Sequence, residues 1–134
     1  MFGKNSYPVK RSETVKVLIN NVNTRQYKFS DNETTLVGRK FKGIIVHTAA
    51  LTKSFDGDDL VTDAIAKKAY VTLSDRDNNQ MIKRLPLEVF FNSNGVIFIE
   101  LDNLEIDLRK SFIDLQDTTG ATAGMAFVFT FFYE

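Results

Sequence analysis

The chain has 134 residues, no cysteine and a formal net charge of zero, with 43% hydrophobic and 25% charged residues. A chain of this length is expected to form one domain around a single core, and the composition argues against disorder. Without cysteine, the fold uses neither disulfides nor thiolate metal sites. No apolar run approaches the roughly 20 residues that span a bilayer, and the first residues lack the apolar core of a secretory signal.

The charge is unevenly distributed along the chain. Residues 1–55 carry ten Lys/Arg against three Asp/Glu, which gives +7, whereas residues 56–134 carry seven against fourteen, which gives −7. Either the two halves interleave in the fold and cancel, or the surface is polarised in a way that suits the packing of copies side by side. We favour interleaving.

Residues 1–12 are polar and basic and lack periodicity, so we interpret them as an extended N-terminal arm that precedes a single domain at 13–134. One alternative is a disordered tail. The other is an arm that lies on a neighbouring subunit or on an interior surface, and apolar anchors in a polar segment favour this second alternative. The predicted subunit-contact residues of the arm are Phe2, Tyr7, Lys10 and Arg11.

The domain shows strand signals at regular intervals, with apolar and polar residues alternating and turn residues between the segments. Residues 25–30 could pair with the first strand or begin a second sheet, and Asp59 could cap a short helix within 59–69. Pro86 is expected at a sheet edge or a strand junction. The segments with strand signals are 13–22, 25–30, 40–51, 69–75, 80–85, 87–91, 96–101, 103–115 and 124–133. This pattern predicts an all-β antiparallel sandwich of about eight strands, with at most one short helix.

The last segment, "AFVFTFFYE", is apolar on both of its alternating faces. We assign Phe127, Phe129, Phe131 and Tyr133 to the core of the sandwich. The opposite face would normally be polar if it were solvated. We therefore expect that face to lie under the N-terminal arm or against a neighbouring subunit, with Phe132 as the residue that reports a partner.

Two patterns suggest catalysis or metal binding, and each has a simpler interpretation. His47 is the only histidine, so any Ser-His-Asp site would have to use it, but no G-x-S-x-G motif accompanies it. We interpret it as an ordinary strand residue. The segment "DRDNN" (75–79) begins like a calcium-binding loop, but Gln80 and Pro86 stand where glycine and glutamate are needed. This loop and "DGDD" (56–59) are interpreted as solvated turns, and we expect no metal, cofactor or catalytic residues.

The cluster "GRKFKG" (38–43) interleaves Arg39, Lys40 and Lys42 with Phe41. Basic groups beside an aromatic ring are typical of nucleic-acid surfaces. Strand alternation also explains this residue pattern, with Phe41 directed inward and the cations outward, and we favour that explanation. No phosphate-binding glycine motif is present.

The order of these features resembles the single jelly-roll structural proteins of tailless icosahedral bacteriophages, of the small capsid or vertex (penton) type. The segments that carry the resemblance are "LVGRKFKGIIVHTA", "DGDDLVTDA", "AYVTLSD", "NNQMIKRLPLEVFF", "IDLRKSFIDL" and the aromatic last strand. The resemblance implies an eight-stranded single jelly roll in which the last strand lies between the first strand and an earlier one. It also implies a virion location after synthesis in the host cytoplasm, without catalytic residues.

Three functions follow from the sequence, in order of preference. The first is a virion structural protein whose partners are copies of itself, with a pentamer as one option, and other capsid proteins. The short chain favours a vertex or minor capsid role over the main shell. The second is a ligand-binding β-sandwich, of a carbohydrate-binding or adhesin-like kind, although the chain has no tryptophan. The third is a nucleic-acid binder, which zero net charge disfavours, so we expect no sequence-specific nucleic acid.

Overall fold

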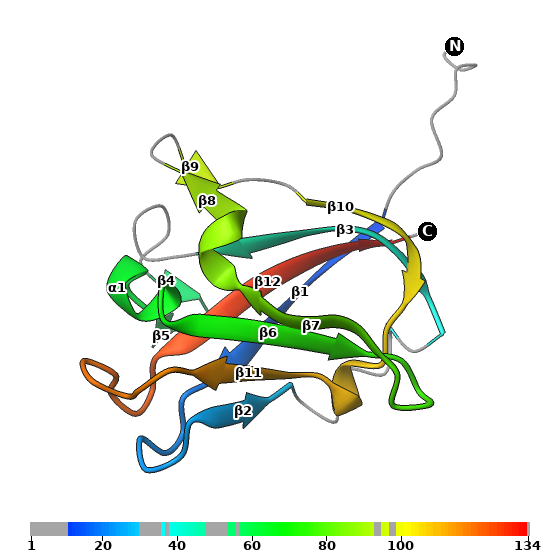
Figure 1. The fold of residues 1–134 in the computed structure, drawn as a ribbon. Helices are drawn as coiled ribbons and strands as arrows, with labels where there is room; N and C mark the ends of the chain where they lie inside the picture. The colour runs from blue at the N-terminus through cyan, green and yellow to red at the C-terminus, as the bar shows by residue number, and fades with distance from the viewer. Residues whose placement is uncertain are drawn as a thin grey trace.

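The structure, a computed structural model, describes residues 11–29, 36, 38–47, 54–55, 57–92, 95–96 and 99–133. Two four-stranded antiparallel sheets pack face to face (Figure 1). The first sheet contains β1 (Arg11–Leu18), β3 (Lys40–His47), β10 (Ile99–Glu105) and β12 (Ala126–Tyr133). The second sheet contains β2 (Gln26–Lys28), β6 (Ala69–Ser74), β7 (Gln80–Pro86) and β11 (Phe112–Leu115).

Short elements connect these strands. Two small hairpins join β4 (Ser54–Phe55) to β5 (Asp58–Asp59) and β8 (Phe91–Asn92) to β9 (Gly95–Val96). Single turns of helix form α1 (Asp63–Ala66), η2 (Leu87–Phe90) and η3 (Leu108–Lys110). Among the described residues, no helix is long and apolar enough to cross a membrane.

The order of the strands defines the fold. The first sheet has the order β1-β12-β3-β10 and the second has the order β2-β11-β6-β7. If the eight long strands are counted along the chain, these orders are 1-8-3-6 and 2-7-4-5, which is the jelly roll of two Greek keys. The predicted eight-stranded antiparallel sandwich is therefore confirmed.

The two oppositely charged halves of the chain are interleaved in the first sheet. Its strands alternate between the basic and the acidic half, because β1 and β3 come from residues 1–55 while β10 and β12 come from residues 56–134. An ion pair between Lys16 on β1 and Asp58 on β5 joins the two halves directly. The charge asymmetry of the sequence is thus largely cancelled by topology.

The last strand occupies the middle of the first sheet, as predicted. β12 pairs with β1 over its whole length, from Arg11 opposite Tyr133 to Leu18 opposite Ala126, and it pairs with β3 on its other side. The inward side chains Phe127, Phe129 and Phe131 are completely buried. Backbone partners on both sides explain why the most aromatic segment of the chain is ordered.

Four phenylalanine rings connect the two sheets. Phe29 follows β2 in the second sheet, and its ring centroid lies 5.3 Å from that of Phe129 and 6.1 Å from that of Phe131. Phe131 also lies 5.1 Å from Phe41 on β3 and 5.9 Å from Phe129. Tilted and offset aromatic pairs of this kind contribute about 0.5–1.5 kcal/mol each beyond the burial of their area.

The outer face of β12 has two different environments along its length. Ala126 and Val128 are buried beneath Leu60, which follows β5, and the N–H of Val61 donates to the carbonyl of Ala126 at 2.9 Å. The prediction that this face lies under the arm or a neighbouring subunit is therefore wrong for Ala126 and Val128, because the β5–α1 connection of the same domain covers them. Phe132, at the other end, is half-buried.

Two local predictions were also wrong. The helix begins at Asp63 rather than near Asp59, because the hydroxyl of Thr62 accepts from the N–H of Ile65 at 3.4 Å, whereas Asp59 belongs to a β-hairpin. Residues 87–90 form a 3-10 turn rather than a strand. Leu87 and Phe90 are both buried, and their spacing of three residues places them on one side of such a turn.

A buried polar cluster fixes the connection from β10 to β11. The Asp107 carboxylate accepts two hydrogen bonds from the Arg109 guanidinium, each at 3.0 Å, and one from the Arg109 backbone N–H. The Ser111 hydroxyl donates to the Asp107 carbonyl and accepts from the N–H of Ser74 on β6. The hydrogen bonds from Arg109 are the main reason that the pKa of Asp107 lies below its ordinary value.

We expect Phe129→Ala to lower the free energy of unfolding by about 3–5 kcal/mol, because it removes a fully buried ring from the inter-sheet cluster. Phe132→Ala, on the opposite face of the same strand, is the matched control. It should cost markedly less, since Phe132 is only half-buried. Urea denaturation of both variants measures the difference, and equal losses would contradict this assignment of the two faces.

We expect Asp107→Asn to lower the stability at neutral pH by about 1–3 kcal/mol, because it weakens charge-assisted hydrogen bonds in a buried cluster. A lowered native pKa stabilises the fold above the unfolded-state value of about 3.9, and this contribution disappears as the pH falls through the native pKa. The difference in the free energy of unfolding between wild type and Asp107→Asn should therefore shrink on acidification below about pH 4. Asp77→Asn, in the exposed β6–β7 turn, is the control, and a gap independent of pH would refute the argument.

Candidate functional site

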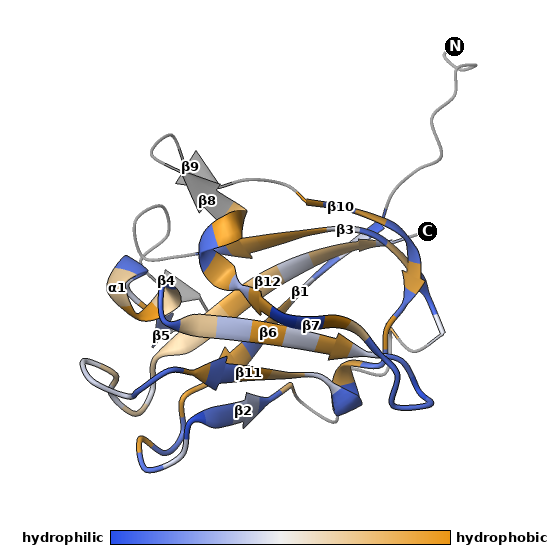
Figure 2. Ribbon diagram, viewed as in Figure 1, coloured by the Kyte–Doolittle hydropathy of each residue, from blue (hydrophilic) through white to orange (hydrophobic). Residues whose placement is uncertain are grey.

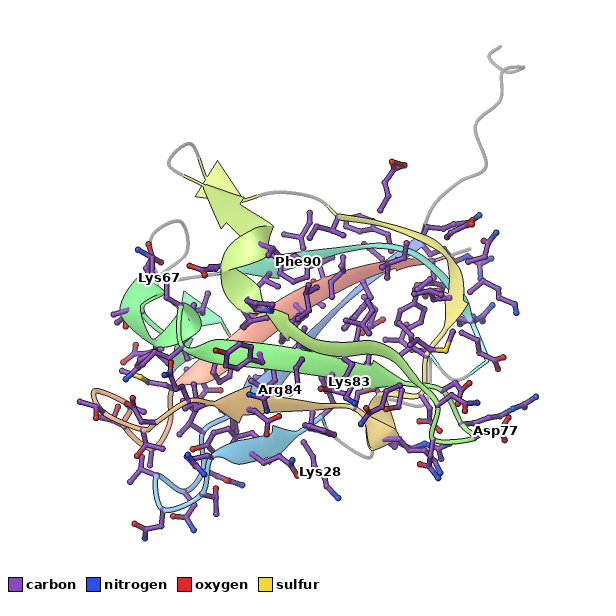
Figure 3. The ribbon with its side chains drawn as sticks, viewed as in Figure 1. Lys28, Lys67, Asp77, Lys83, Arg84 and Phe90 are labelled. Atoms are coloured by element: carbon purple, nitrogen blue, oxygen red, sulfur yellow. The ribbon has the colours of Figure 1, made fainter. Side chains whose placement is uncertain are left out.

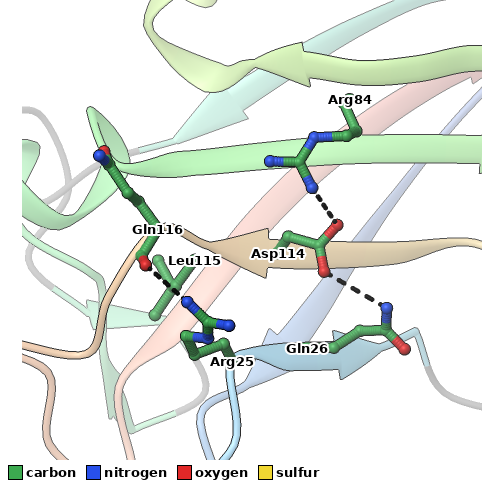
Figure 4. A pocket seen from close by; sticks show the side chains of 6 residues that line it. All are labelled: Arg25, Gln26, Arg84, Asp114, Leu115 and Gln116. Atoms are coloured by element: carbon green, nitrogen blue, oxygen red, sulfur yellow. Dashed lines mark hydrogen bonds and ion pairs between the residues drawn. The ribbon is translucent and has the colours of Figure 1, made fainter.

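A polar hollow of about 480 Å³ lies on the outer face of the second sheet (Figure 4). It is formed where β2, β11 and β6 lie side by side, because Gln26, Asp114 and Tyr70 are aligned across these strands and share one face. In Figure 2, β2 and parts of β7 and β11 are hydrophilic, whereas β12 is largely apolar. The residues that line the hollow are Arg25, Gln26, Arg84, Asp114, Leu115 and Gln116.

The side chains around the hollow hold one another in place. Asp114 accepts from Arg84 Nη1 and from Gln26 Nε2, both at 3.3 Å, and Arg25 Nη1 donates to the carbonyl of Gln116 at 3.1 Å (Figure 4). The Asp114 side chain is 17% exposed and that of Arg84 is 55% exposed. Asp114 thus forms the floor between two guanidinium groups that remain open to solvent.

Arg84 reaches this position through a β-bulge. On β7, Ile82 pairs with Leu73 and Leu85 pairs with Val71, so two residues of β7 lie opposite the single residue Thr72. Arg84 has a left-handed φ of 50°, and its N–H donates to the Thr72 hydroxyl at 3.1 Å. An arginine in the left-handed region costs about 1–2 kcal/mol relative to its normal conformation.

The bulge also places the Arg84 guanidinium over an aromatic ring. Its central carbon lies 4.6 Å from the ring centroid of Tyr70 on β6. Lys28, Lys83 and Arg84 are all seen on this side of the molecule in Figure 3. Bulges often redirect a side chain at a functional site, so the strained backbone at Arg84 is an independent indication of a functional surface.

The predicted subunit-contact residues are only partly described. Phe2, Tyr7 and Lys10 lie outside the described residues, while Arg11 is exposed at the start of β1. Phe132 lies on the outer face of the first sheet between Ser12 of β1 and Gly43 of β3. Whether these residues contact a second subunit stays a prediction.

The basic cluster on β3 is arranged as strand alternation predicts. Phe41 is fully buried, and the Arg39 guanidinium lies 5.6 Å from the ring centroid of Tyr133. Lys40 is exposed and lies opposite Glu105 on β10, while Lys42 is half-buried. An acidic residue within the cluster weakens it as a surface for phosphates.

His47 belongs to a polar row on the outer face of the first sheet. Its Nε2 lies 2.8 Å from the Thr130 hydroxyl, which is 2.9 Å from the Thr14 hydroxyl. Partial burial lowers the pKa of His47 below its ordinary value. Its interpretation as a strand residue fits this arrangement, in which three adjacent strands share hydrogen bonds.

The acidic loops are explained by local hydrogen bonding where they are described. The Asp75 carboxylate accepts from the N–H groups of Asp77 and Asn79 and from the Asn79 side chain, and the Asn79 side chain is the main cause of its lowered pKa. Asp58 pairs with Lys16. Within the described part of the chain, no group of three or more His, Cys, Asp or Glu side chains is arranged to hold a metal ion.

The hollow was not predicted from the sequence. Its residues come from three separate segments, and each segment alone resembles an ordinary strand edge. One signal was present, because Ile82 and Leu85 are both inward although they are three residues apart. A strand with strict alternation would place them on opposite faces, so this spacing indicates a bulge.

Comparisons with known proteins identify no relative. No protein-family model, no curated protein and no solved structure matches the chain.

We expect Arg84→Ala to be less stable than Arg84→Gly by about 1 kcal/mol, because both remove the guanidinium but only glycine tolerates the left-handed backbone without strain. The same pair of substitutions at Lys83, the other bulge residue, is the control, since Lys83 lacks a positive φ. Thermal or urea unfolding of the four variants measures both differences. If Arg84→Ala and Arg84→Gly were equally stable, the backbone of the bulge would relax around alanine without strain, and the prediction would be wrong.

Proposed function

We propose that the protein is a non-enzymatic structural protein of a virion, which assembles through protein–protein contacts in an icosahedral capsid at the vertex or as a minor component. The observation that carries the proposal is the strand order of the two sheets, since eight-stranded jelly rolls build many viral capsids. The fold alone does not determine function, because lectins and cupins share it. The order of sequence features that resembles phage capsid proteins is the second support.

The outer face of the first sheet offers a surface for assembly. Leu60 covers one end of β12, whereas Phe132 and Ile45 at the other end are half-buried beside Thr14 and Thr130. A small apolar centre with a polar surround is the usual composition of a protein–protein interface. Copies that meet through this face would bury Phe132 and Ile45 further.

The charge of the protein is compatible with close packing of copies. Formal net charge is zero, so neighbouring copies experience little overall repulsion. The interleaving of the basic and acidic halves leaves both signs on the first sheet, where Lys40 lies opposite Glu105. Charges of both signs can pair between copies and select one relative orientation.

We expect the purified protein to form a discrete homo-oligomer whose population grows with concentration, measured by native mass spectrometry and light scattering. Phe132→Ser should shift the distribution towards monomer while the far-UV circular dichroism is unchanged. Met81→Ser is the matched control, because Met81 is an exposed apolar residue on the other sheet. A strict monomer at the highest attainable concentration that also fails to join particles would rule the proposal out.

A further inference from the structure

We propose that the hollow between Arg25 and Arg84 binds a carboxylated sugar unit, such as a uronic acid, of an acidic oligosaccharide. This binding function is additional to assembly, and its site lies on the outer face of the second sheet, whereas the proposed assembly surface lies on the first. Gln26, Arg84, Asp114 and Leu115 lie on strands, so neighbouring strands fix them, while Arg25 and Gln116 directly adjoin β2 and β11 and are tied together by the Arg25–Gln116 hydrogen bond.

Positive charge is concentrated on this face. The bulge places both Lys83 and Arg84 opposite Thr72, and Lys28 lies on the same side at the far edge of the sheet (Figure 3). Arg25 adds a fourth cation, while among the described residues Asp114 is the only acidic one that lines the hollow. Arginine is well suited to bind a carboxylate, because its planar guanidinium can donate two parallel hydrogen bonds.

Asp114 distinguishes a sugar site from a simple anion site. A pocket that bound only an anion would gain nothing from a carboxylate on its floor, because like charges repel. Sugar hydroxyls both donate and accept, so Asp114 can accept from a hydroxyl while Gln26 and Gln116 supply both donors and acceptors. Two arginines and one aspartate leave a single positive charge, which matches one carboxylate.

The guanidinium groups are oriented before a ligand arrives. Arg84 is held between the Tyr70 ring and Asp114, and Arg25 is held by the carbonyl of Gln116. A guanidinium carries five N–H donors, and the contacts described occupy only some of them. The remaining donors of Arg25 and Arg84 are available to a ligand. Groups that are already fixed lose less conformational entropy on binding, which favours affinity.

The size and openness of the hollow fit the end of a chain rather than a buried small molecule. Its volume of about 480 Å³ lies within the range of roughly 300–1,000 Å³ found for ligand pockets. Lys28 and Lys83 lie beyond the lining residues, where they can meet acidic groups on the following sugars. A longer acidic oligosaccharide should therefore bind more tightly than a single unit.

The experiment is isothermal titration of the 134-residue chain at fixed ionic strength with trigalacturonate, with the neutral trisaccharide maltotriose and with inorganic phosphate. We expect trigalacturonate to bind at least about tenfold more tightly than either of the others, since the carboxylate and the hydroxyls are recognised together. Equal affinity for phosphate would show a non-specific anion surface, and no binding of trigalacturonate would show that the hollow is not a sugar site. Both results overturn the proposal.

Variants locate the binding on the hollow. Arg25→Gln and Arg84→Lys should each weaken trigalacturonate binding about tenfold, the second because lysine keeps the charge but loses the two-pronged donor. Arg76→Gln is the control, since it removes the same charge from the β6–β7 turn and Arg76 does not line the hollow; the neighbouring Asp77 lies well away from Arg84 in Figure 3. An equal loss in the control would assign the binding to overall charge and refute the site. Native mass spectrometry of the same variants should show unchanged oligomers. Loss of sugar binding can therefore be distinguished from loss of assembly.

Discussion

The position of β12 between β1 and β3 is the constraint on which the remainder of the structure depends. A central strand needs backbone partners along both edges and cover on both faces. The partners are β1 and β3, and the inward face is covered by rings that reach from the second sheet, Phe29 among them. The outward face requires Leu60, which explains why the β5–α1 connection crosses the first sheet rather than extending into solvent.

The two outer faces of the sandwich have different chemistry as a result. The first sheet has an outer surface that is part apolar and part hydroxyl-lined, with Phe132 and Ile45 near the Thr14–Thr130 pair. The second sheet carries arginine and lysine around a single aspartate. A protein that assembles through one face and binds ligand through the other needs such a division, because each surface stays accessible while the second is engaged.

The architecture could be predicted from the sequence where it depends on patterns within one segment, such as alternation of apolar and polar residues. Alternation identified the core face of residues 127–133, and the turn residues separated the strands correctly in most places. It failed at residues 87–90, where the segment "LEVF", apolar at three of its four positions, is compatible with both a strand and a 3-10 turn. The hollow was not predictable, because its alignment of Gln26, Asp114 and Tyr70 depends on which strands become neighbours. These neighbours, β2 with β11 and β11 with β6, are distant in sequence, so no local pattern records their pairing.

The pairing of Arg11 with Tyr133 has a kinetic consequence. The first sheet cannot close until residues separated by almost the whole described chain meet, and such non-local sheets fold slowly, over about milliseconds to seconds. During that interval β12 is unpaired, and its eight residues, "AFVFTFFY", contain no charge and no proline. Segments of this composition pair readily with copies of themselves into cross-β aggregates. The strand that completes the native fold is therefore also the segment from which misassembly would begin at high concentrations of newly made chains.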